Sequence, residues 1–411
     1  MKKEKLKVGA IGLGNRGTSI LKYTLIPFYE EGMIEISAIC DNYEDRVERG
    51  LKELEEKGVP KPFATTDYRE VLKLDLDAVV IITSWETHVG IAIEAMKAGI
   101  YPGIEAGGAY NVEECWELVE TSEKTGIPCM LLENCCYGRR ELMAFEMVKR
   151  GLFGEIVYCQ GGYLHDLRYE VSHGEENRHY RLKNYIHRNC ENYPTHEIGP
   201  IAKILGINDG NRMLYLTSMS SKARGLHDYI VDRKGKDDKY ADTVFNQGDI
   251  ISTTIKCSGG ELIHITLDTT LPRAYSRDFT IRGTKGGYFE ETDSVFLDHT
   301  HDEFELDRRK IWENAEEYAE EYKHTVWKKY FPKGGHDGMD ELVYRAFFES
   351  VKNGTNPPID VYDAAAWMSI TALTEKSIAL GGAPVEIPDF TKGKWMNRTD
   401  IADGDFSLKI K

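Results

Sequence analysis

The first third of the chain alternates between short apolar runs and longer amphipathic stretches rich in charge. This alternation predicts strands and helices in turn. The predicted strands cover residues 6–11, 34–40, 77–83, 101–105 and 128–132, and the predicted helices between them cover 44–57, 88–98 and 112–125. Repeated strand–helix units are typical of a doubly wound parallel sheet, so we expect an N-terminal α/β domain of the Rossmann type.

The pattern changes beyond this region, where strand-like runs dominate. The predicted strands cover 155–165, 213–219, 249–257, 261–270, 278–283 and 286–296, and the predicted helices cover 140–150, 196–205, 338–353 and 361–380. This order predicts an α+β domain with an open, largely antiparallel sheet. Because 411 residues exceed one ordinary core, we divide the chain into a Rossmann domain at 1–135 and an α+β domain at 136–411.

Composition and charge narrow the classes of partner. Hydrophobic residues make up 41% of the chain, and no apolar run is long enough to span a bilayer. The formal charge is −16, from 52 basic and 68 acidic residues, which disfavours nucleic acid and anionic membranes as partners. Much of the acid falls in 302–321, which we predict to be one solvated helical face.

The eight cysteines are scattered, without C-x-x-C or zinc-ligand spacing. We therefore expect neither a disulfide framework nor a metal site, and we expect Cys135 and Cys136 to act as small buried hydrophobic residues. Residues 1–5 lead directly into the first strand without a hydrophobic leader segment. This favours a cytoplasmic protein, unless an export signal has been removed.

A glycine fingerprint follows the first predicted strand. Gly12 would permit a tight turn, Gly14 a close approach to a pyrophosphate, and Gly17 close packing of the next helix. Asp41 ends the second predicted strand, where a carboxylate would bind a ribose 2′-hydroxyl and repel a 2′-phosphate. The segment therefore predicts an NAD site, against the simpler reading of a glycine-rich turn with a solvated aspartate. The fingerprint residues that we assign to NAD are Gly12, Leu13, Gly14, Asn15, Arg16, Gly17 and Asp41.

Further cofactor contacts are expected where the parallel strands end. Ligands of such sheets bind at the carboxyl ends of the strands, so these ends should line one crevice. The residues that we add to the cofactor site are Thr83, Trp85, His88, Glu105, Glu133, Asn134 and Tyr193.

The layout resembles the oxidoreductase family that includes glucose–fructose oxidoreductase and inositol 2-dehydrogenase. In those enzymes a strand end has the sequence Glu-Lys-Pro, and its lysine assists proton transfer. The matching stretch here is Glu105-Ala106-Gly107, and alanine cannot exchange a proton. A histidine that opens a helix ahead of Leu-Gly is retained as His196.

Several longer strings are similar to one subgroup, glycoside hydrolase family 109. They are Glu-Asn-Cys-Cys-Tyr at 133–137, and the stretches 161–168, 192–200, 268–277 and 334–340. The resemblance extends over nearly the whole chain and implies NAD-dependent removal of terminal N-acetylgalactosamine. Glu197 and Asp337 depart from it, because glycine is expected at both positions.

The implied chemistry is oxidation of the sugar at C3, elimination across C1–C2, addition of water and re-reduction, with no net consumption of NAD. His196 is the candidate that takes the 3-hydroxyl proton, because imidazole titrates near neutrality. Tyr193 precedes it across Pro194, which would direct both side chains to one sugar. A structural histidine near a helix start is the alternative for His196.

Tyr163 and His165 lie two apart on a predicted strand and so share one face, either of the site or of the inter-domain core. We assign Tyr163 as the base at C2 and His165 as the group that assists the aglycone or water, although these roles could be exchanged. Glu133 would bind the nicotinamide ribose or substrate hydroxyls, with a surface carboxylate as the alternative. Arg181 and Tyr275 are the remaining substrate-binding candidates, with surface packing as the alternative for both.

Two other functions fit the fingerprint. A conventional NAD-dependent sugar dehydrogenase or epimerase is the first, and the missing lysine at Ala106 argues against it. A catalytically idle dinucleotide-binding sensor is the second, and the clustered tyrosines and histidines argue against that. Elimination through a C2 carbanion accommodates both α and β linkages and both galacto- and gluco-configured sugars. By analogy with the family, we also expect a homo-oligomer, a dimer or larger.

Overall fold

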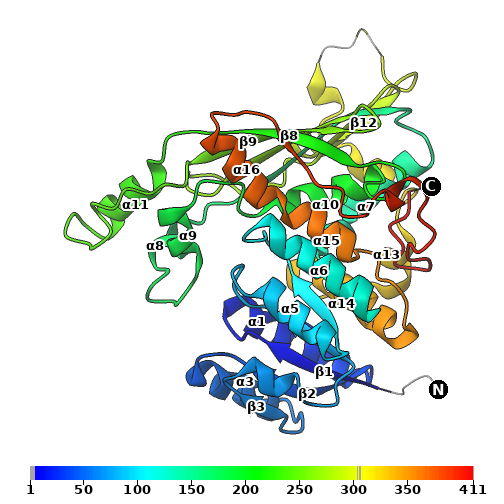
Figure 1. Cartoon of the computed structure of the whole chain (residues 1–411). Coiled ribbons are helices and arrows are strands. Elements are labelled where there is room, and N and C mark those ends of the chain that lie inside the picture. Colours follow the sequence, from blue (N-terminus) through cyan, green and yellow to red (C-terminus); the bar gives the residue numbers. More distant parts are fainter. Residues whose placement is uncertain (1–4, 303, 305–306, 411) are drawn as a thin grey trace.

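The computed structural model describes residues 5–302, 304 and 307–410. Two sheets lie one above the other in Figure 1, with helices between them and around the lower sheet. The lower sheet is built from the N-terminal third of the chain, coloured blue to cyan. Among the described residues, no helix is long and apolar enough to cross a membrane.

The lower sheet is the predicted Rossmann sheet. Its strands are β1 (Leu6–Ile11), β2 (Ile34–Cys40), β3 (Phe63–Thr65), β4 (Ala78–Ile81), β5 (Tyr101–Glu105) and β6 (Met130–Leu132). Within the described residues all neighbouring pairs are parallel, in the order β3-β2-β1-β4-β5-β6. The helices of this part are α1 (Asn15–Ile20), which continues through a π-helical turn η1 (Leu21–Leu25) into α2 (Ile26–Glu30), then α3 (Glu44–Glu56), α4 (Tyr68–Val71), α5 (His88–Lys97) and α6 (Val112–Thr125). The order reverses between β1 and β4, where doubly wound sheets bind their ligands.

The three fingerprint glycines meet different neighbours. A Cβ on Gly12, whose φ is +102°, would lie 2.3 Å from the carbonyl oxygen of Ile82. A Cβ on Gly17 would lie 2.0 Å from the carbonyl oxygen of Gly12, so both positions exclude a side chain. A Cβ on Gly14 would meet only the side chain of Arg46, at 3.6 Å. Packing therefore requires glycine at the first and third positions, and the second is open toward a ligand.

The second sheet is largely antiparallel, as predicted. Its strands are β7 (Ile156–Leu164), β8 (Met213–Ser220), β9 (Ile250–Cys257), β10 (Leu262–Asp268), β11 (Thr280–Gly283), β12 (Gly286–Phe289), β13 (Ser294–Leu297) and β14 (Val385–Glu386). Their order in the described chain is β13-β12-β11-β7-β10-β9-β8-β14, and of these pairs only β7–β10 is parallel. Burial alternates along β9, which is the pattern of a sheet with one packed face.

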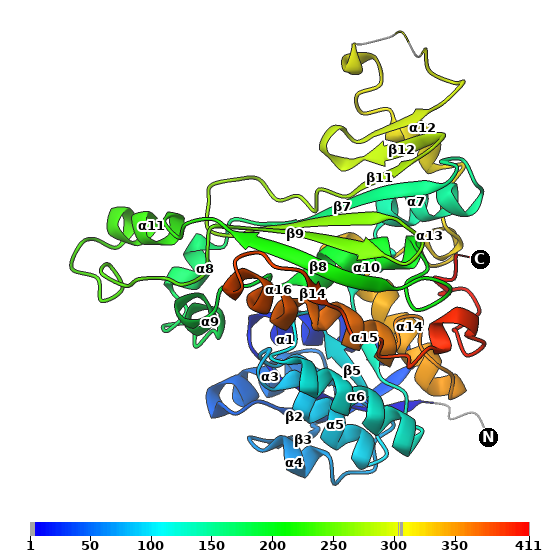
Figure 2. The same cartoon turned by 45° about the horizontal axis from the view of Figure 1, so that its top comes forward.

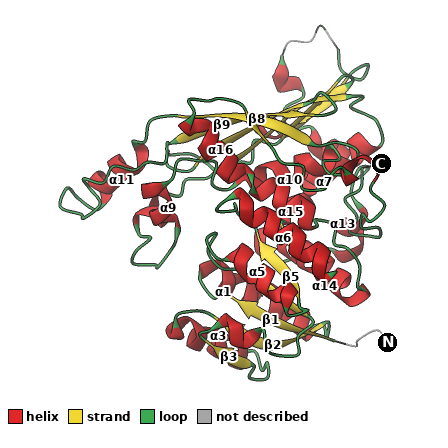
Figure 3. Ribbon diagram, in the orientation of Figure 1, coloured by secondary structure: helices red, strands yellow, loops and turns green. Residues whose placement is uncertain are grey.

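Helices from the second half fill the space between the two sheets (Figures 2 and 3). The longer ones are α7 (Arg139–Lys149), α10 (Pro194–Ile204), α14 (Met339–Asn353), α15 (Val361–Met368) and α16 (Ile370–Ala379). α10 packs on β7, α16 packs on β8, and α14 and α15 contact β6 of the Rossmann sheet. One buried hydrophobic cluster joins both halves of the chain. The division at residue 135 remains a prediction from the sequence.

Some elements differ from the sequence expectations. The predicted helix 361–380 is divided at Ser369, and the predicted strand 286–296 is broken by a 3₁₀ turn at Glu290–Thr292. The acidic run 302–321 is not one helix: its described residues form a 3₁₀ turn and the short helix α12 (Ala315–Ala319), and residues 303, 305 and 306 lie outside the described chain. A dense run of charge offers no continuous apolar stripe for a long helix to bury.

Several short elements were not predicted. They are α8 (Arg168–Ser172), α9 (Arg181–His187), α11 (Gly225–Arg233), α13 (Thr325–Tyr330), and the 3₁₀ turns η2 (Asn134–Tyr137), η4 (Arg308–Lys310), η5 (Gly335–Gly338) and η6 (Lys394–Asn397). α8, α9 and α11 project from one end of the second sheet in Figure 2. Most of the N-terminal run 1–5 lies outside the described residues.

Candidate active site

A cleft of about 1230 Å³ lies where the carboxyl ends of the Rossmann strands face the second half of the chain. It brings together many of the predicted site residues. Those that line it are Gly12, Gly14, Asn15, Arg16, Gly17, Asp41, Thr83, Glu105, Asn134, Tyr163, Arg181, Tyr193 and His196. The remaining predicted residues are Leu13, Trp85, His88, Glu133, His165 and Tyr275, which lie behind or beside this lining.

Asp41 is hydrogen-bonded to the backbone of the glycine fingerprint. Its Oδ2 accepts a 2.7 Å hydrogen bond from the backbone N–H of Leu13, and its Oδ1 accepts one from the N–H of Tyr43. The carboxylate is almost fully buried, yet it borders the cleft. The guanidinium of Arg46 lies 3.6 Å away. The end of β2 and the glycine turn are thereby joined at the place where a ribose-binding carboxylate is needed.

Arg16 connects the fingerprint to the far end of the chain. Its guanidinium lies 3.0 Å from the carboxylate of Glu105 and 2.7 Å from that of Asp340 at the start of α14. Asp340 also accepts hydrogen bonds from Asn134 and contacts His336 at 2.9 Å. Although burial alone would raise the pKa of Asp340, the hydrogen bonds and charges of Arg16 and His336 outweigh burial and lower it. Four separate segments thus fix one corner of the cleft.

His88 and Trp85 support the cleft from behind. His88 is 1% exposed, and its Nε2 lies 3.3 Å from the carbonyl oxygen of Gly108. Burial lowers the pKa of His88 to about 4, so its imidazole is neutral at physiological pH. The ring of Trp85 packs edge-on against Tyr180, with the ring centres 4.7 Å apart, and the guanidinium of Arg181 lies 5.2 Å from it. Both side chains shape the wall of the cleft.

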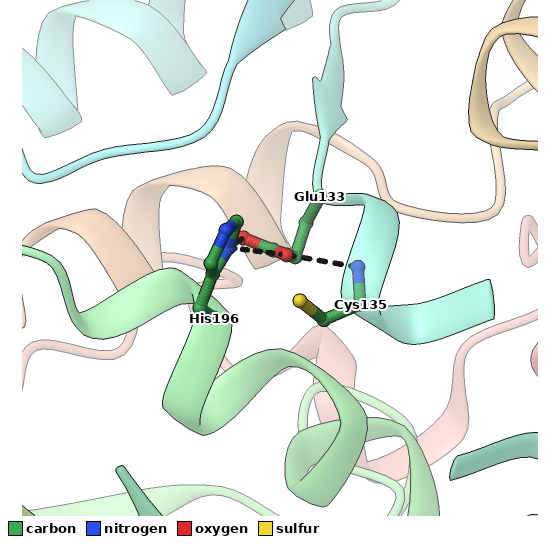
Figure 4. A group of neighbouring side chains, drawn as sticks. All are labelled: Glu133, Cys135 and His196. Carbon is green, nitrogen blue, oxygen red and sulfur yellow. Dashed lines mark hydrogen bonds and ion pairs between the residues drawn. The ribbon is translucent and has the colours of Figure 1, made fainter. Parts of the chain in front are cut away.

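Glu133 and His196 form a buried pair (Figure 4). Nδ1 of His196 lies 2.7 Å from Oε1 and 2.8 Å from Oε2 of Glu133, which is fully buried. Burial acts to raise the pKa of Glu133, but the charge and hydrogen bond of His196 outweigh it, so the pKa is lowered. An ionised carboxylate only accepts hydrogen bonds, so Nδ1 must donate, and Nε2 is left to meet a substrate. The surface alternative for Glu133 is therefore wrong.

Aromatic rings surround His196. The ring centres of Tyr163 and Tyr193 are 4.5 Å apart, and that of His196 lies 4.7 Å from Tyr193. The hydroxyl of Tyr163 lies 3.2 Å from Nδ1 of His165, whose ring meets Tyr275 edge-on. Tyr163 therefore lines the cleft and also contacts His165, on the side of the site where His165 meets Tyr275.

The titration of these groups follows from their burial. Burial raises the pKa of Tyr163, and the positive charge of Arg181 opposes this only in part. Burial lowers the pKa of His165, and Arg181 lowers it further. At neutral pH the pair is therefore a phenol beside a neutral imidazole, so the imidazole can accept the phenolic proton.

Arg181 is a buried cation at the centre of the site. It begins α9 and is 7% exposed, and its Nε lies 3.1 Å from Glu170. Its guanidinium also lies 5.2 Å from the ring centre of Tyr193 and 5.8 Å from that of Tyr163. The surface alternative for Arg181 is therefore wrong. Tyr275 is 49% exposed, so that alternative stays open for it.

Glu133, Cys135 and His196 each place one possible ligand atom within 4.8 Å of the others (Figure 4). Nδ1 of His196 already faces the Glu133 carboxylate, and the backbone N–H of Cys135 donates to the same carboxylate. Burial raises the pKa of the Cys135 thiol well above its ordinary value, so it remains protonated. We therefore treat these residues as a hydrogen-bonded group and assign no metal to them. The absence of a metal remains a prediction.

The cleft suits a dinucleotide. Thr83 lines the cleft and buries an Oγ1 that has no hydrogen-bond partner among the described residues. Gly14 leaves open space beside the fingerprint, and α1 begins after it without a side-chain cap, so that backbone N–H groups are available to phosphate. Free donors, an open glycine and the Asp41 carboxylate together match the parts of NAD.

An arm from the second half of the chain, residues 168–187, crosses the cleft toward α3. Arg178 forms a double ion pair with Asp45, with distances of 2.9 and 2.6 Å, and Arg46 donates to the carbonyl oxygens of Asn177 and Arg178. His179 and Tyr180 of this arm line the cleft. None of these contacts was predicted, although the dense histidine and arginine content of 178–188 was the available signal.

Two family models match the chain. Residues 6–132 match the oxidoreductase family with an NAD-binding Rossmann fold, and residues 137–397 match the C-terminal domain of glycosyl hydrolase 109. The chain belongs to glycosyl hydrolase family 109. An α-N-acetylgalactosaminidase of Tannerella forsythia is 40% identical over 96% of this chain and 88% of its own length. A family 109 protein of Parabacteroides distasonis is 38% identical over the same shares.

Solved structures share the fold at low sequence identity. Levoglucosan dehydrogenase, in a complex with NADH and levoglucosan, superposes with a TM-score of 0.68 at 19% identity, covering 93% of this chain and all of that one. An oxidoreductase of Thermotoga maritima gives 0.62 at 16%, covering 94% and 99%. The family 109 chain is therefore a glycosidase-family member built on an oxidoreductase fold, as predicted.

Proposed function

We propose that this family 109 protein hydrolyses terminal N-acetylgalactosaminides and uses NAD as a bound cofactor that is regenerated in each turnover. The observation that supports this most directly is the Glu133–His196 pair beside Tyr163 and Tyr193, in the same cleft as the glycine fingerprint. The 40% identical relative named α-N-acetylgalactosaminidase supports the choice of sugar. The cleft therefore combines a dinucleotide site with its own acid–base groups.

NAD, when bound, supplies reversible oxidation at C3 of the sugar, which acidifies the hydrogen on C2. His196 takes the proton of the 3-hydroxyl at Nε2, because Glu133 holds Nδ1 as a donor. The carboxylate also stabilises the imidazolium that forms. Tyr193, packed edge-on to the imidazole, restricts its ring and borders the sugar.

Tyr163 and His165 act together at C2 and C1. The neutral imidazole of His165 receives the phenolic proton, so that the Tyr163 oxygen can take the hydrogen from C2. The protonated His165 then donates its proton to the oxygen of the departing aglycone, and Tyr163 keeps the proton taken from C2. The sequence left open which residue is the base at C2 and which assists the aglycone. The 3.2 Å contact between Tyr163 and His165 supports a single relay in which both take part.

Arg181 and Tyr275 bind the substrate in this proposal. Arg181 offers planar N–H donors to sugar oxygens and counters negative charge as it develops on Tyr163. Tyr275, half exposed beside His165, packs on the apolar face of the sugar. Both flank the Tyr163–His165 relay.

A sugar dehydrogenase is the second candidate. Ala106 lines the cleft at the strand end where the related oxidoreductases have their lysine, so that position offers no proton-transfer group. A dehydrogenase would release a reduced cofactor in proportion to substrate, whereas the proposed hydrolase would not.

The test is turnover of a nitrophenyl N-acetylgalactosaminide by the purified protein without added cofactor. We expect catalytic release of nitrophenol, incorporation of deuterium at C2 of the product in D₂O, and no build-up of reduced nicotinamide. Stoichiometric reduced nicotinamide without nitrophenol release would refute the hydrolase. Absence of deuterium at C2 would refute the elimination. His196→Ala is expected to abolish turnover.

The remaining expectations stay predictions. A preference for NAD over NADP follows from Asp41, and competition between the two dinucleotides for the apoprotein tests it. Cell fractionation tests a cytoplasmic location, and light scattering coupled to gel filtration tests the expected homo-oligomer.

A further inference from the structure

Two buried carboxyl groups lie directly behind the aromatic site. Glu191 is 0% exposed and Glu197 is 1% exposed, and neither lines the cleft. Glu197 belongs to α10, and Glu191 lies in the segment that leads into it. One oxygen of Glu197 accepts a 2.9 Å hydrogen bond from the backbone N–H of Tyr163, and one oxygen of Glu191 accepts a 3.1 Å bond from that of Tyr193. Each carboxyl thus holds the backbone of one cleft tyrosine.

The second oxygen of each carboxyl group is unsatisfied: among the described residues, neither Oε2 has a hydrogen-bond partner. Each carboxyl is among the groups that shift the pKa of the other, so the two lie close together. Burial raises the pKa of Glu191 to about 8, and burial together with the charge of Glu191 raises the pKa of Glu197 well above the ordinary range. In the described chain no lysine, arginine or histidine is among the groups that shift these two values. Two adjacent buried carboxyl groups without a counter-ion cannot both ionise.

We propose that Glu191 and Glu197 keep a proton between them and serve as a positioning pair that joins β7 to the start of α10. The pair does not touch the substrate. It fixes the separation of Tyr163 and Tyr193, whose rings are 4.5 Å apart, and it sets the start of the helix that presents His196. Loss of the last proton places two like charges at the start of α10 and drives Glu191 and Glu197 apart, which disturbs the hydrogen bonds that they accept from Tyr193 and Tyr163.

The opposing surface is close, because a Cβ added to Gly161 of β7 would lie 2.6 Å from the carbonyl oxygen of Glu197. β7 and α10 are therefore in tight contact where the pair joins them. The effect on catalysis rests on the proposed hydrolase function, whereas the shared proton does not.

The first experiment measures the shared proton without reference to activity. Infrared spectra of the whole purified protein at pH 7 are expected to show the carbonyl stretch of a protonated carboxylic acid, which a double variant with Glu191→Gln and Glu197→Gln loses. Glu375→Gln is the control, because Glu375 is a half-buried residue of α16 that pairs with Arg188 outside the site. An identical carbonyl band in the native protein and in the double variant would overturn the shared proton.

The native protein, Glu197→Gln and Glu375→Gln are compared in thermal unfolding between pH 5 and pH 8. A carboxyl whose pKa is raised in the folded state binds its proton more tightly there, so its stabilisation is lost as pH rises toward the folded pKa. The native protein should therefore lose more stability than Glu197→Gln over this range. Equal losses would overturn the proposal.

The second experiment measures kcat and KM for the nitrophenyl substrate across pH. Glu197→Gln keeps the shape and the hydrogen bonds of the pair, so kcat at pH 7 should remain within about threefold of the native value. Its alkaline decline should begin at higher pH, because ionisation of Glu191 alone leaves no second charge to repel it. Glu197→Ala leaves the Tyr163 N–H unpaired and should lower kcat about 10- to 100-fold with a smaller change in KM.

The outcomes distinguish failure of the positioning pair from failure of the proposed hydrolase function. An unchanged alkaline decline in Glu197→Gln, or full kcat in Glu197→Ala, would overturn the positioning role. The other titratable groups of the site are the same in every variant: Tyr163, His165, Arg181, Tyr193, His196 and Glu133. If the native protein fails to cleave the substrate, the proposed function falls, while the infrared and unfolding results still decide whether the proton is shared.

Discussion

Replacement of Glu133 by glutamine tests how the site prepares His196. The carboxylate contacts Nδ1 through both oxygens, at 2.7 and 2.8 Å, and is fully buried. A hydrogen bond to a charged group contributes about 1.5–3 kcal/mol, which corresponds to a roughly 10- to 150-fold change in rate. The amide can also donate to Nδ1, which would leave the proton on Nε2, the atom that must act as the base. The comparable change in a serine-protease triad costs about 10⁴-fold.

We therefore expect Glu133→Gln to lower kcat by about 10²- to 10⁴-fold with little change in KM. The assay is nitrophenol release at substrate concentrations that define both constants, with circular dichroism to confirm folding. His196→Asn provides the matched background: because Glu133 acts through His196, adding Glu133→Gln to that variant should change the remaining rate little. A kcat within about threefold of the native value, or losses that multiply in the double variant, would refute the reasoning.

Three further predictions use other parts of the site. Asp41→Ala removes the acceptor of the Leu13 N–H and should weaken NAD binding to the apoprotein about tenfold by calorimetry, and unchanged affinity would contradict this. Asp337 has a left-handed φ of +52°, so Asp337→Gly should raise the free energy of unfolding by about 1 kcal/mol in urea titrations, whereas a destabilised variant would show that its side chain makes a compensating contact. The pKa of Asp340 is lowered, so its stabilisation is present at neutral pH and lost as pH falls through the acid range; Asp340→Asn should flatten this acid dependence of unfolding, and an equally steep curve would contradict it.

The Rossmann half could be predicted from sequence because its signals are local. The strand Leu6–Ile11 and the glycines after it encode their own geometry, and β2 ends at Cys40, directly before Asp41. The spacing of apolar residues also predicted the order of the longer strands and helices in the second half of the chain. Among the candidates placed at strand ends, Thr83, Glu105 and Asn134 line the cleft, and Tyr163 reaches it from the face of β7.

The other parts of the fold and of the site depend on contacts between residues far apart in the sequence, which no local sequence pattern predicts. The arm 168–187 consists of short helices that pack on a separate buried cluster with Val171, Leu182 and Tyr185, and such short helices give weak periodicity. The ion pair of Arg178 with Asp45 adds a contact between residues far apart in the sequence. Glu191 and Glu197 look like ordinary acidic residues until the fold buries both. The acidic run 302–321 shows the opposite error, since a strong charge pattern predicted a helix that packing does not support.

The link between Arg16 and Asp340 has a consequence for how the protein is made. Asp340 follows Arg16 by 324 residues, so a growing chain exposes its fingerprint long before the partner of that arginine leaves the ribosome. All six parallel strands lie in the N-terminal third of the chain and are synthesised early. The corner of the cleft formed by Arg16, Glu105 and Asp340 is completed only near the end of synthesis. Chains interrupted before Asp340 lack this corner, so the cleft is complete only in nearly full-length chains.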